Sequence, residues 1–272
     1  MDVTKAGLPL GGYRLNFLRA AILVLFALAP LVQGGNEFLS PDPVGAPPLP
    51  TAASWTEALD SYLAANRHQQ DRLRDSTMEV DIQARLPRLK KEALQRAFRL
   101  VAPTGEVSYR PVSSTGDNMV RKEVIARYMT EEMDASRKSA IGDAKFQSMG
   151  ITRDNYKFSY KGMIKWNDRQ VYMFQVSPKQ KRVGLFKGEI WVDSLTFQAL
   201  RESGTFVKSP SLYLSKVQFV REYEIQEGLA IPTHISSKID TRVGVGPAEV
   251  DIRFSGFSNV LTARSRICPL GW

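Results

Sequence analysis

The stretch KVQFVREYEIQEGLAIPTHISSKIDTR, residues 216–242, shows most directly how this chain of 272 residues folds. Two runs rich in β-branched and aromatic residues, 216–226 and 231–242, lie on either side of Glu227-Gly228. Two such runs joined by a short polar bend that contains glycine are typical of a β-hairpin. The stretch therefore predicts a pair of antiparallel strands.

The same pattern continues on both sides of this hairpin. After it, Ala248–Phe257 places Val250, Ile252 and Phe254 on one face of a strand, and Asp251 and Arg253 on the other. Before it, the sequence predicts strands at 156–160, 171–176, 182–193 and 195–202, with turns at Asn167-Asp168 and Asp193-Ser194. Short strands at close spacing with polar turns predict one large antiparallel sheet.

The first half of the folded region mixes helices with strands. Ser54 and Glu57 form a capping box for an amphipathic helix over 54–67. Apolar positions at helical spacing predict a second helix over 119–133, with a strand at its start as the alternative, and a short third helix near 139–149. Alternating apolar residues predict strands at 78–86, 93–101 and 107–109.

Two of the predicted strands are apolar on both faces. In 182–193 one face carries Phe186, Ile190 and Val192, and the other carries Val183, Leu185 and Trp191. A strand of this kind must be covered on both faces, or must leave one face open to a ligand. The sequence therefore predicts an α+β fold: a large curved antiparallel sheet, an unclosed half-barrel, with a few helices covering its concave face.

The N-terminal segment predicts export from the cytoplasm. Residues 1–35 have a basic start, an apolar run at Ala20–Ala29 and small residues at Gly34-Gly35, as a cleavable signal peptide does. Residues 36–53 are rich in proline and are expected to be a linker, followed by a single β-rich domain over 54–265. The predicted location is the periplasm, and an uncleaved signal that anchors the domain to the inner membrane is the alternative.

The composition limits the kinds of binding site and activity that we expect of this protein. The formal charge of +9 would suit an anionic partner, but export argues against nucleic acid, so a solvated cationic surface is the preferred interpretation. Cys268 is the only cysteine, and His68 and His234 are the only histidines. The sequence contains no two-histidine zinc motif, phosphate-binding loop or nucleophile elbow. We therefore expect no metal, no cofactor and no enzymatic activity.

The segment GEIWVDSLTFQALR, residues 188–201, resembles proteins of the LolA/LolB-like superfamily, which includes bacterial lipoprotein-sorting proteins, lipid carriers and periplasmic sensors. The resemblance covers roughly residues 54–260. It implies an unclosed barrel whose helices lid an apolar cavity for acyl chains. The proline-rich linker and the insert around 110–150 depart from the pattern of the lipoprotein carrier itself.

The expected function is a non-catalytic periplasmic carrier or binder of lipid or lipoprotein acyl chains, with an envelope membrane protein or a lipoprotein as a further partner. One alternative is a periplasmic sensor or interaction domain that binds a protein, and a less favoured one is an envelope hydrolase. The residues expected to line the cavity are Phe158, Tyr160, Phe174, Phe186, Ile190, Phe219 and Tyr223.

Overall fold

The computed structural model describes residues 52–141, 150–209, 214–241 and 246–259. The predicted signal peptide and almost all of the predicted linker lie outside these residues. Within them, the helical elements are α2 (Ala52–Arg72), η1 (Pro87–Leu89), α3 (Asn118–Val120), the π-helical turn η2 (Arg121–Ile125) and α4 (Ala126–Ala140).

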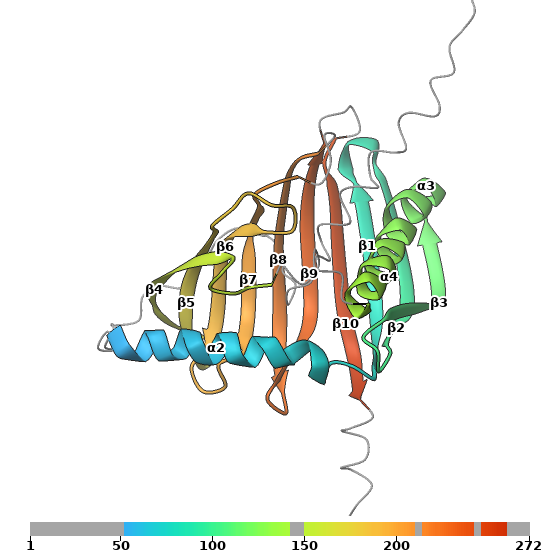
Figure 1. Ribbon diagram of the computed structural model, residues 1–272. Helices are drawn as coiled ribbons and strands as arrows, with labels where there is room; N and C mark the ends of the chain where they lie inside the picture. The colour runs from blue at the N-terminus through green and yellow to red at the C-terminus, as the bar shows by residue number, and fades with distance from the viewer. Residues whose placement is uncertain (1–51, 142–149, 210–213, 242–245, 260–272) are drawn as a thin grey trace, which may run out of the picture.

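Ten strands form one antiparallel sheet (Figure 1). They are β1 (Ser76–Leu86), β2 (Lys91–Val101), β3 (Val107–Gly116), β4 (Tyr156–Trp166), β5 (Arg169–Pro178), β6 (Phe186–Asp193), β7 (Ala199–Phe206), β8 (Leu214–Gln226), β9 (Leu229–Thr241) and β10 (Ala248–Asn259). Their order is β3-β2-β1-β10-β9-β8-β7-β6-β5-β4. The sheet is not closed, because the order ends in β3 at one edge and in β4 at the other.

Two tight turns were predicted correctly from their residues. Asn167 and Asp168 join β4 to β5 with φ values of 47° and 61°, and Glu227 and Gly228 join β8 to β9 with φ values of 51° and 69°. Two successive residues with positive φ match the right-handed twist of paired strands. These turns therefore fix the register of two hairpins locally.

The sequence prediction is wrong in detail for the hairpin between β6 and β7. The strand predicted to begin at Leu195 begins at Ala199, and Leu195 lies in the connection with 82% of its surface exposed. The Asp193 carboxylate accepts hydrogen bonds from the Thr196 backbone N–H at 2.9 Å and from the Thr196 hydroxyl at 2.7 Å. Because of this turn, which the Asp193 side chain stabilises, the connection is longer than predicted and the second strand begins later in the sequence.

The predicted helices are confirmed with changed boundaries. Helix α2 extends beyond 54–67 at both ends, so Ser54 lies inside it and is not its N-cap. Residues 118–140 are helical throughout, and the alternative of a strand at the start of 119–133 was wrong. Asp117 caps this helix by accepting hydrogen bonds from the backbone of Met119 and Val120. Of the third helix predicted near 139–149, residues 142–149 lie outside the described part of the chain.

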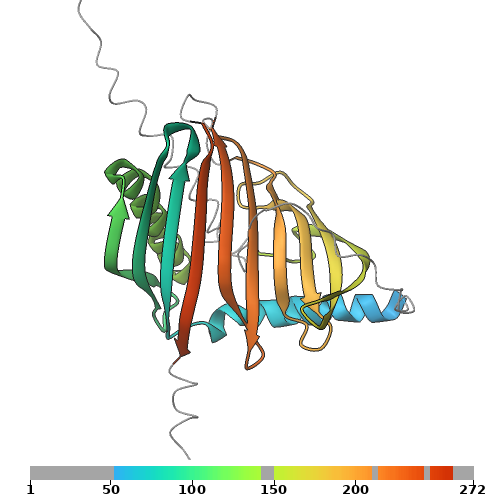
Figure 2. The same ribbon diagram turned by 180° about the vertical axis from the view of Figure 1, so that it is seen from behind.

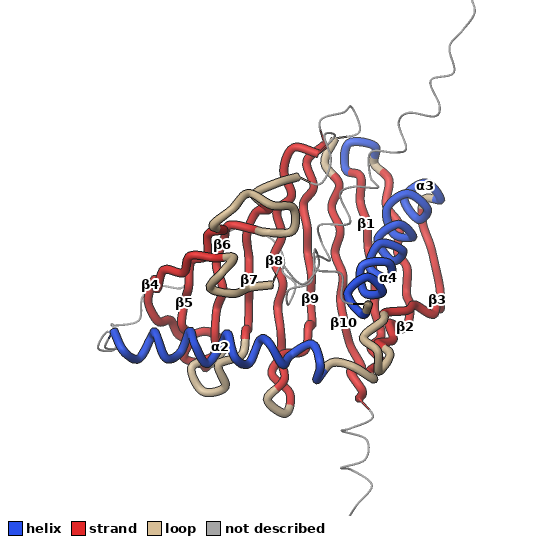
Figure 3. Tube along the Cα trace, in the orientation of Figure 1, coloured by secondary structure: helices blue, strands red, loops and turns tan. Residues whose placement is uncertain are grey.

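Helices α2 and α4 cover the same face of the curved sheet, in front of it in Figure 1 and behind it in Figure 2. Figure 3 shows α2 running across the lower part of the sheet and α4 lying over the end formed by β1, β2 and β3. We call the face that the helices cover the concave face. The predicted α+β half-barrel is therefore confirmed.

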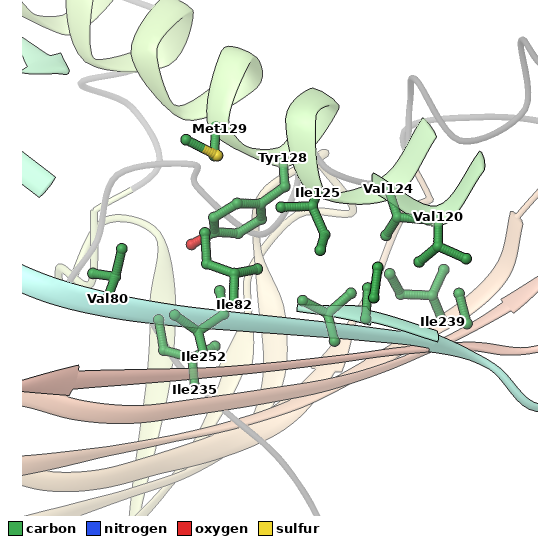
Figure 4. Packing of buried hydrophobic residues seen from close by; sticks show 14 of the residues in the cluster. Val80, Ile82, Val120, Val124, Ile125, Tyr128, Met129, Ile235, Ile239 and Ile252 are labelled. Carbon is green, nitrogen blue, oxygen red and sulfur yellow. The ribbon is translucent and has the colours of Figure 1, made fainter. Parts of the chain in front are cut away.

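Beneath α4 lies a first apolar cluster, which is shown in Figure 4. Val124, Ile125 and Tyr128 pack onto Ile82 of β1 and Ile252 of β10. Valine and isoleucine at alternate strand positions face the helix because successive side chains of a strand point to opposite faces. This cluster joins the N-terminal strands to the C-terminal strand β10.

The prediction of strands apolar on both faces is only partly correct. Trp191 points away from the helices, opposite Ile190 and Val192, as predicted. Val183 and Leu185 precede β6 instead of belonging to it, and buried Leu185 packs in the same cluster as Phe186. The outer face of the sheet thus carries fewer apolar residues than the pattern indicated.

We expect Gly188→Ala to destabilise the fold by about 1–3 kcal/mol, because overpacking forces neighbouring groups to shift. Gly188 on β6 faces Gly204 on β7, and a Cβ at Gly188 would lie 1.8 Å from the Ser203 carbonyl oxygen. Urea unfolding measures the loss. The control is Gly150→Ala, whose Cβ would lie 3.7 Å from the nearest side-chain atom, an ordinary contact. Equal midpoints for the two variants would contradict the prediction.

Candidate functional site

The seven residues expected to line a cavity lie together on the concave face. They come from β4, β5, β6 and β8 and belong to a second apolar cluster, in which Phe158 and Tyr160 are partly buried and the others are buried. Neighbouring rings contact each other: Tyr160 lies 5.9 Å from Phe174, and Phe186 lies 5.2 Å from Phe219, between ring centroids. The seven residues thus belong to one apolar cluster on the sheet, and their role in binding a ligand stays a prediction.

Helix α2 covers this second cluster. Leu59, Tyr62 and Leu63 are the buried residues that it contributes. Near its N-terminal end, Trp55 stacks on Tyr160 with ring centroids 6.0 Å apart and planes 1° from parallel. The strands supply an aromatic floor and α2 supplies an apolar cover.

Polar contacts hold α2 mainly at its C-terminal end. Arg72 donates hydrogen bonds to the backbone carbonyls of Gly228 and Glu227, each at 3.0 Å, and Gln69 bonds with the backbone of Ala230. At the other half of the helix, Asp60 pairs with Arg153 at 2.6 Å in an exposed position. Exposed pairs of this kind contribute little to stability. In the N-terminal half of the helix, Trp55 and Leu59 pack on the apolar side chains of the strands.

A buried polar group interrupts the apolar surface. Glu202 of β7 and Arg221 of β8 have side chains 0% and 3% exposed, with 3.9 Å between the nearest oxygen and nitrogen. Tyr223 connects them: its hydroxyl accepts a hydrogen bond from Arg221 Nη1 at 3.2 Å and donates one to Glu202 Oε2 at 3.4 Å. Tyr62 of α2 faces the same carboxyl.

Burial shifts the ionisation of this pair. It raises the pKa of Glu202 to about 8, against the opposing effect of the Arg221 charge, and it lowers the pKa of Arg221 to about 10. The Glu202 carboxyl is therefore protonated more readily than an exposed glutamate, whereas Arg221 keeps its charge. The counter-charge beside Arg221 is weakened, and Glu132 is its other acidic neighbour.

The sequence prediction missed Glu202 and Arg221, although one signal was present. Arg221 alternates along β8 with Val217 and Phe219, so it falls on the apolar face of its own strand. Charged residues are rarely buried unless they are paired. An arginine in such a stripe therefore indicates either a structural pair or a binding group.

A second buried ionic group lies under α4. Arg99 of β2 donates to Glu132 Oε1 from Nη2 at 2.7 Å and from Nε at 3.0 Å, and the Tyr109 hydroxyl donates to Glu132 Oε2. Burial opposes the charge of Arg99, yet the adjoining Glu132 carboxylate raises its pKa. Close geometry and several hydrogen bonds make this group a structural clamp between α4 and the sheet.

The outer face of the sheet carries a row of aromatic and charged side chains. Trp166 and Trp191 pack edge to face with centroids 5.7 Å apart, and the Arg201 guanidinium lies 5.0 Å from a Trp191 ring centroid. Further along, His234 of β9 lies 2.7 Å from Asp251 and 3.6 Å from Glu222. The hydrogen bond to Asp251, supported by Glu222, raises the pKa of His234 to about 9.

His234 should make stability depend on pH. Because its folded pKa exceeds the unfolded value of about 6.5, its contribution is complete below that value and is lost as the pH rises through about 9. After a discount for partial exposure, we expect a loss of about 1–2 kcal/mol between pH 6 and 10. Urea unfolding across this range should show the slope in the native chain. His234→Gln should make the slope shallower, leaving the part that the raised pKa of Glu202 contributes, and an unchanged slope would contradict the assignment.

A separate cleft lies at the lower ends of β1, β2, β3 and β10, away from the predicted residues. Its volume is about 380 Å³. The residues that line it are Asp75, Ser76, Thr77, Leu100, Val101, Ala102, Ser108, Ser258 and Asn259. Asp75 is the one acidic residue in this lining, so the cleft does not contain the carboxylate pair that is typical of glycosidases. Among the described residues, no group of three or more histidine, cysteine or acidic side chains could hold a metal ion.

Comparison with known proteins finds likeness in structure only. No family model and no curated protein matches the chain. A LolA superfamily protein from Nitrosomonas europaea is 15% identical, with 74% of this chain and 92% of that chain covered and a TM-score of 0.37. A DUF1329 family protein from Desulfovibrio piger is 14% identical, with coverages of 75% and 93% and a TM-score of 0.39.

A chain of the MucA/MucB complex from Pseudomonas aeruginosa is also similar, at 10% identity, coverages of 76% and 96% and a TM-score of 0.24. The similar solved structures thus include a protein of the LolA superfamily, which residues 188–201 resemble. Since identity and TM-score are low, the function is inferred from the geometry of the site alone. No helix in the described ranges is long and apolar enough to cross a membrane.

Proposed function

We propose that this protein is a non-catalytic periplasmic binder or carrier of lipid or lipoprotein acyl chains. The observation that carries the proposal is the aromatic cluster of β4, β5, β6 and β8 on which the apolar side chains of α2 pack, among them Trp55 on Tyr160. An acyl chain offers the same kind of contact as Leu59 and Leu63 do. It could therefore replace α2 on the sheet: each buried methylene of the ligand contributes about 0.8 kcal/mol, which offsets the cost of exposing the apolar side chains of α2.

The periplasmic location in this proposal rests on the predicted signal peptide over 1–35. Proteolytic mapping of the N-terminus of the protein recovered from a bacterial envelope fraction tests it. A mature N-terminus near residue 36 supports cleavage. An intact leader in the membrane fraction would favour the anchored form.

Lipid extraction of the purified protein followed by mass spectrometry tests the carrier function. We expect co-purifying acyl lipids, and we expect a fluorescent fatty acid to bind in competition with them. The control variant is Trp166→Ala, which alters the outer face and should leave binding unchanged. If neither extraction nor titration detects an acyl ligand, the proposal fails.

A specific observation also favours the alternative of a protein-binding sensor domain. Trp166, Trp191 and Arg201 gather on the outer face, and tryptophan and arginine are enriched at protein interfaces. This function predicts that Trp166→Ala abolishes capture of an envelope membrane protein by the native chain, whereas Leu59→Ala does not. The two variants thus separate the two functions.

A further inference from the structure

The Arg221 side chain has an unsatisfied buried donor. Arg221 Nε is buried and has no acceptor within the part of the chain that the structure describes. The guanidinium carries five N–H donors, and its nearest carboxylate oxygen, on Glu202, is 3.9 Å from Nη1, too far for a hydrogen bond. Buried polar groups in native proteins normally have partners, so an unsatisfied arginine points to a missing acceptor.

The position of Arg221 suits the end of an acyl ligand. On β8 it follows Phe219 of the second apolar cluster, and Val217 of the first cluster lies on the same face. Arg221 is close enough to α4 to interact with Tyr128 and Glu132, and through Tyr223 and Glu202 it is linked to Tyr62 of α2. It therefore lies where the two helix-covered regions meet.

We propose that Arg221, held by Tyr223, binds with the Glu202 carboxyl the oxyanion head of an acyl ligand, a carboxylate or a phosphate, whose hydrocarbon chain lies on the strand surface that α2 covers in this structure. This inference rests on the proposed carrier function and adds the chemical class of the ligand. A guanidinium can donate two parallel hydrogen bonds to an oxyanion, which gives both affinity and orientation. The apolar floor then accepts the chain, and the polar group accepts the head.

Charge at the site agrees with this assignment. The oxyanion would add a negative charge beside Arg221, and the Glu202 carboxyl, whose pKa burial raises, can in its protonated form donate a hydrogen bond to it. Above about pH 8, Glu202 ionises and repels the head group. The other titratable groups that face this pair are Tyr62, Tyr128, Tyr156, Tyr223 and Glu132. The pKa values of the four tyrosines are all raised by burial, so these hydroxyls stay neutral.

The test compares a fatty acid with the fatty alcohol of equal length, each carrying a fluorophore at its far end. At pH 7 the native protein should bind the acid about tenfold more tightly than the alcohol, as expected for one charge-assisted pair. At pH 9 this preference should shrink, and Glu202→Gln should retain it. Phosphatidic acid against diacylglycerol with the same chains distinguishes a phosphate head from a carboxylate head.

Two variants connect the preference to Arg221. Arg221→Met should reduce affinity for the acid to that for the alcohol and leave the alcohol affinity unchanged. Since a single change in a buried pair can impair folding, the double variant Arg221→Met/Glu202→Leu provides an apolar centre of similar volume, which folds well in comparable proteins. Circular dichroism and thermal unfolding confirm that each variant is folded.

The outcomes separate the two proposals. Binding of both probes with equal affinity by the native protein overturns the head-group site and leaves the carrier function standing. A preference for the acid that persists in the double variant also overturns it. Failure to bind any of the four amphiphiles refutes the carrier function itself.

Discussion

Replacing Arg99 with methionine is expected to lower the free energy of unfolding by about 3–5 kcal/mol, because it leaves the Glu132 carboxylate buried without its counter-charge. The Arg99 and Glu132 side chains are 16% and 5% exposed, and two hydrogen bonds join them beneath α4. The Tyr109 hydroxyl alone cannot replace the lost charge. Equilibrium unfolding in urea, followed by tryptophan fluorescence, measures the difference.

The matched control for Arg99 is on the same strand. Arg96 pairs with Asp81 at 2.8 Å on the outer face, where both side chains are well exposed, so Arg96→Met should change stability little. The double variant Arg99→Met/Glu132→Leu should recover most of the stability lost in the single variant. Equal losses in Arg99→Met and Arg96→Met would show that burial of the pair does not matter.

Local chemistry explains which parts of the fold could be predicted. Asn167-Asp168 and Glu227-Gly228 adopt the positive φ values that a two-residue hairpin turn requires, and this requirement is visible in the residues themselves. The pairing of β1 with β10 joins residues such as Ile82 and Ile252, which lie far apart in the sequence. Pairing at such separation leaves no local signal, so the predictions gave the strands but not their order.

The apolar residues of the candidate site could be predicted because they alternate along their strands. Phe174, Ile190 and Phe219 follow the alternation of their strands, and the structure places them on one face. Arg221 and Glu202 were not identified because a charged residue inside a strand is normally taken to face solvent. The alternation of Arg221 with Val217 and Phe219 places it on the apolar face, but no local pattern shows that Tyr62 of α2 and Tyr128 of α4 come to lie over this pair.

Shortening Leu59 to alanine is expected to loosen α2 by about 2–5 kcal/mol, the usual cost of removing a buried leucine side chain. Leu59 is 1% exposed in the cluster between α2 and the strands. If acyl chains displace α2, the substitution weakens the packing of this helix on the strands and leaves the sheet itself intact. Amide hydrogen exchange in residues 52–72 should then speed up at least about tenfold, since about 1.4 kcal/mol corresponds to a factor of ten. Acyl affinity should rise by at most the same factor, because the open form becomes more populated.

Leu86→Ala is the matched control, because Leu86 is 2% exposed but lies in the cluster under α4. It should reduce the stability of the sheet by a similar amount and leave the acyl affinity unchanged. The comparison shows whether α2 is a movable cover or an integral part of the core. If α2 is a movable cover, only Leu59→Ala strengthens acyl binding. If α2 is part of the core, both variants unfold more easily and neither binds acyl chains more tightly. A Leu59→Ala variant with faster exchange in 52–72 but no gain in acyl affinity would mean that the surface beneath α2 is not where the chain binds.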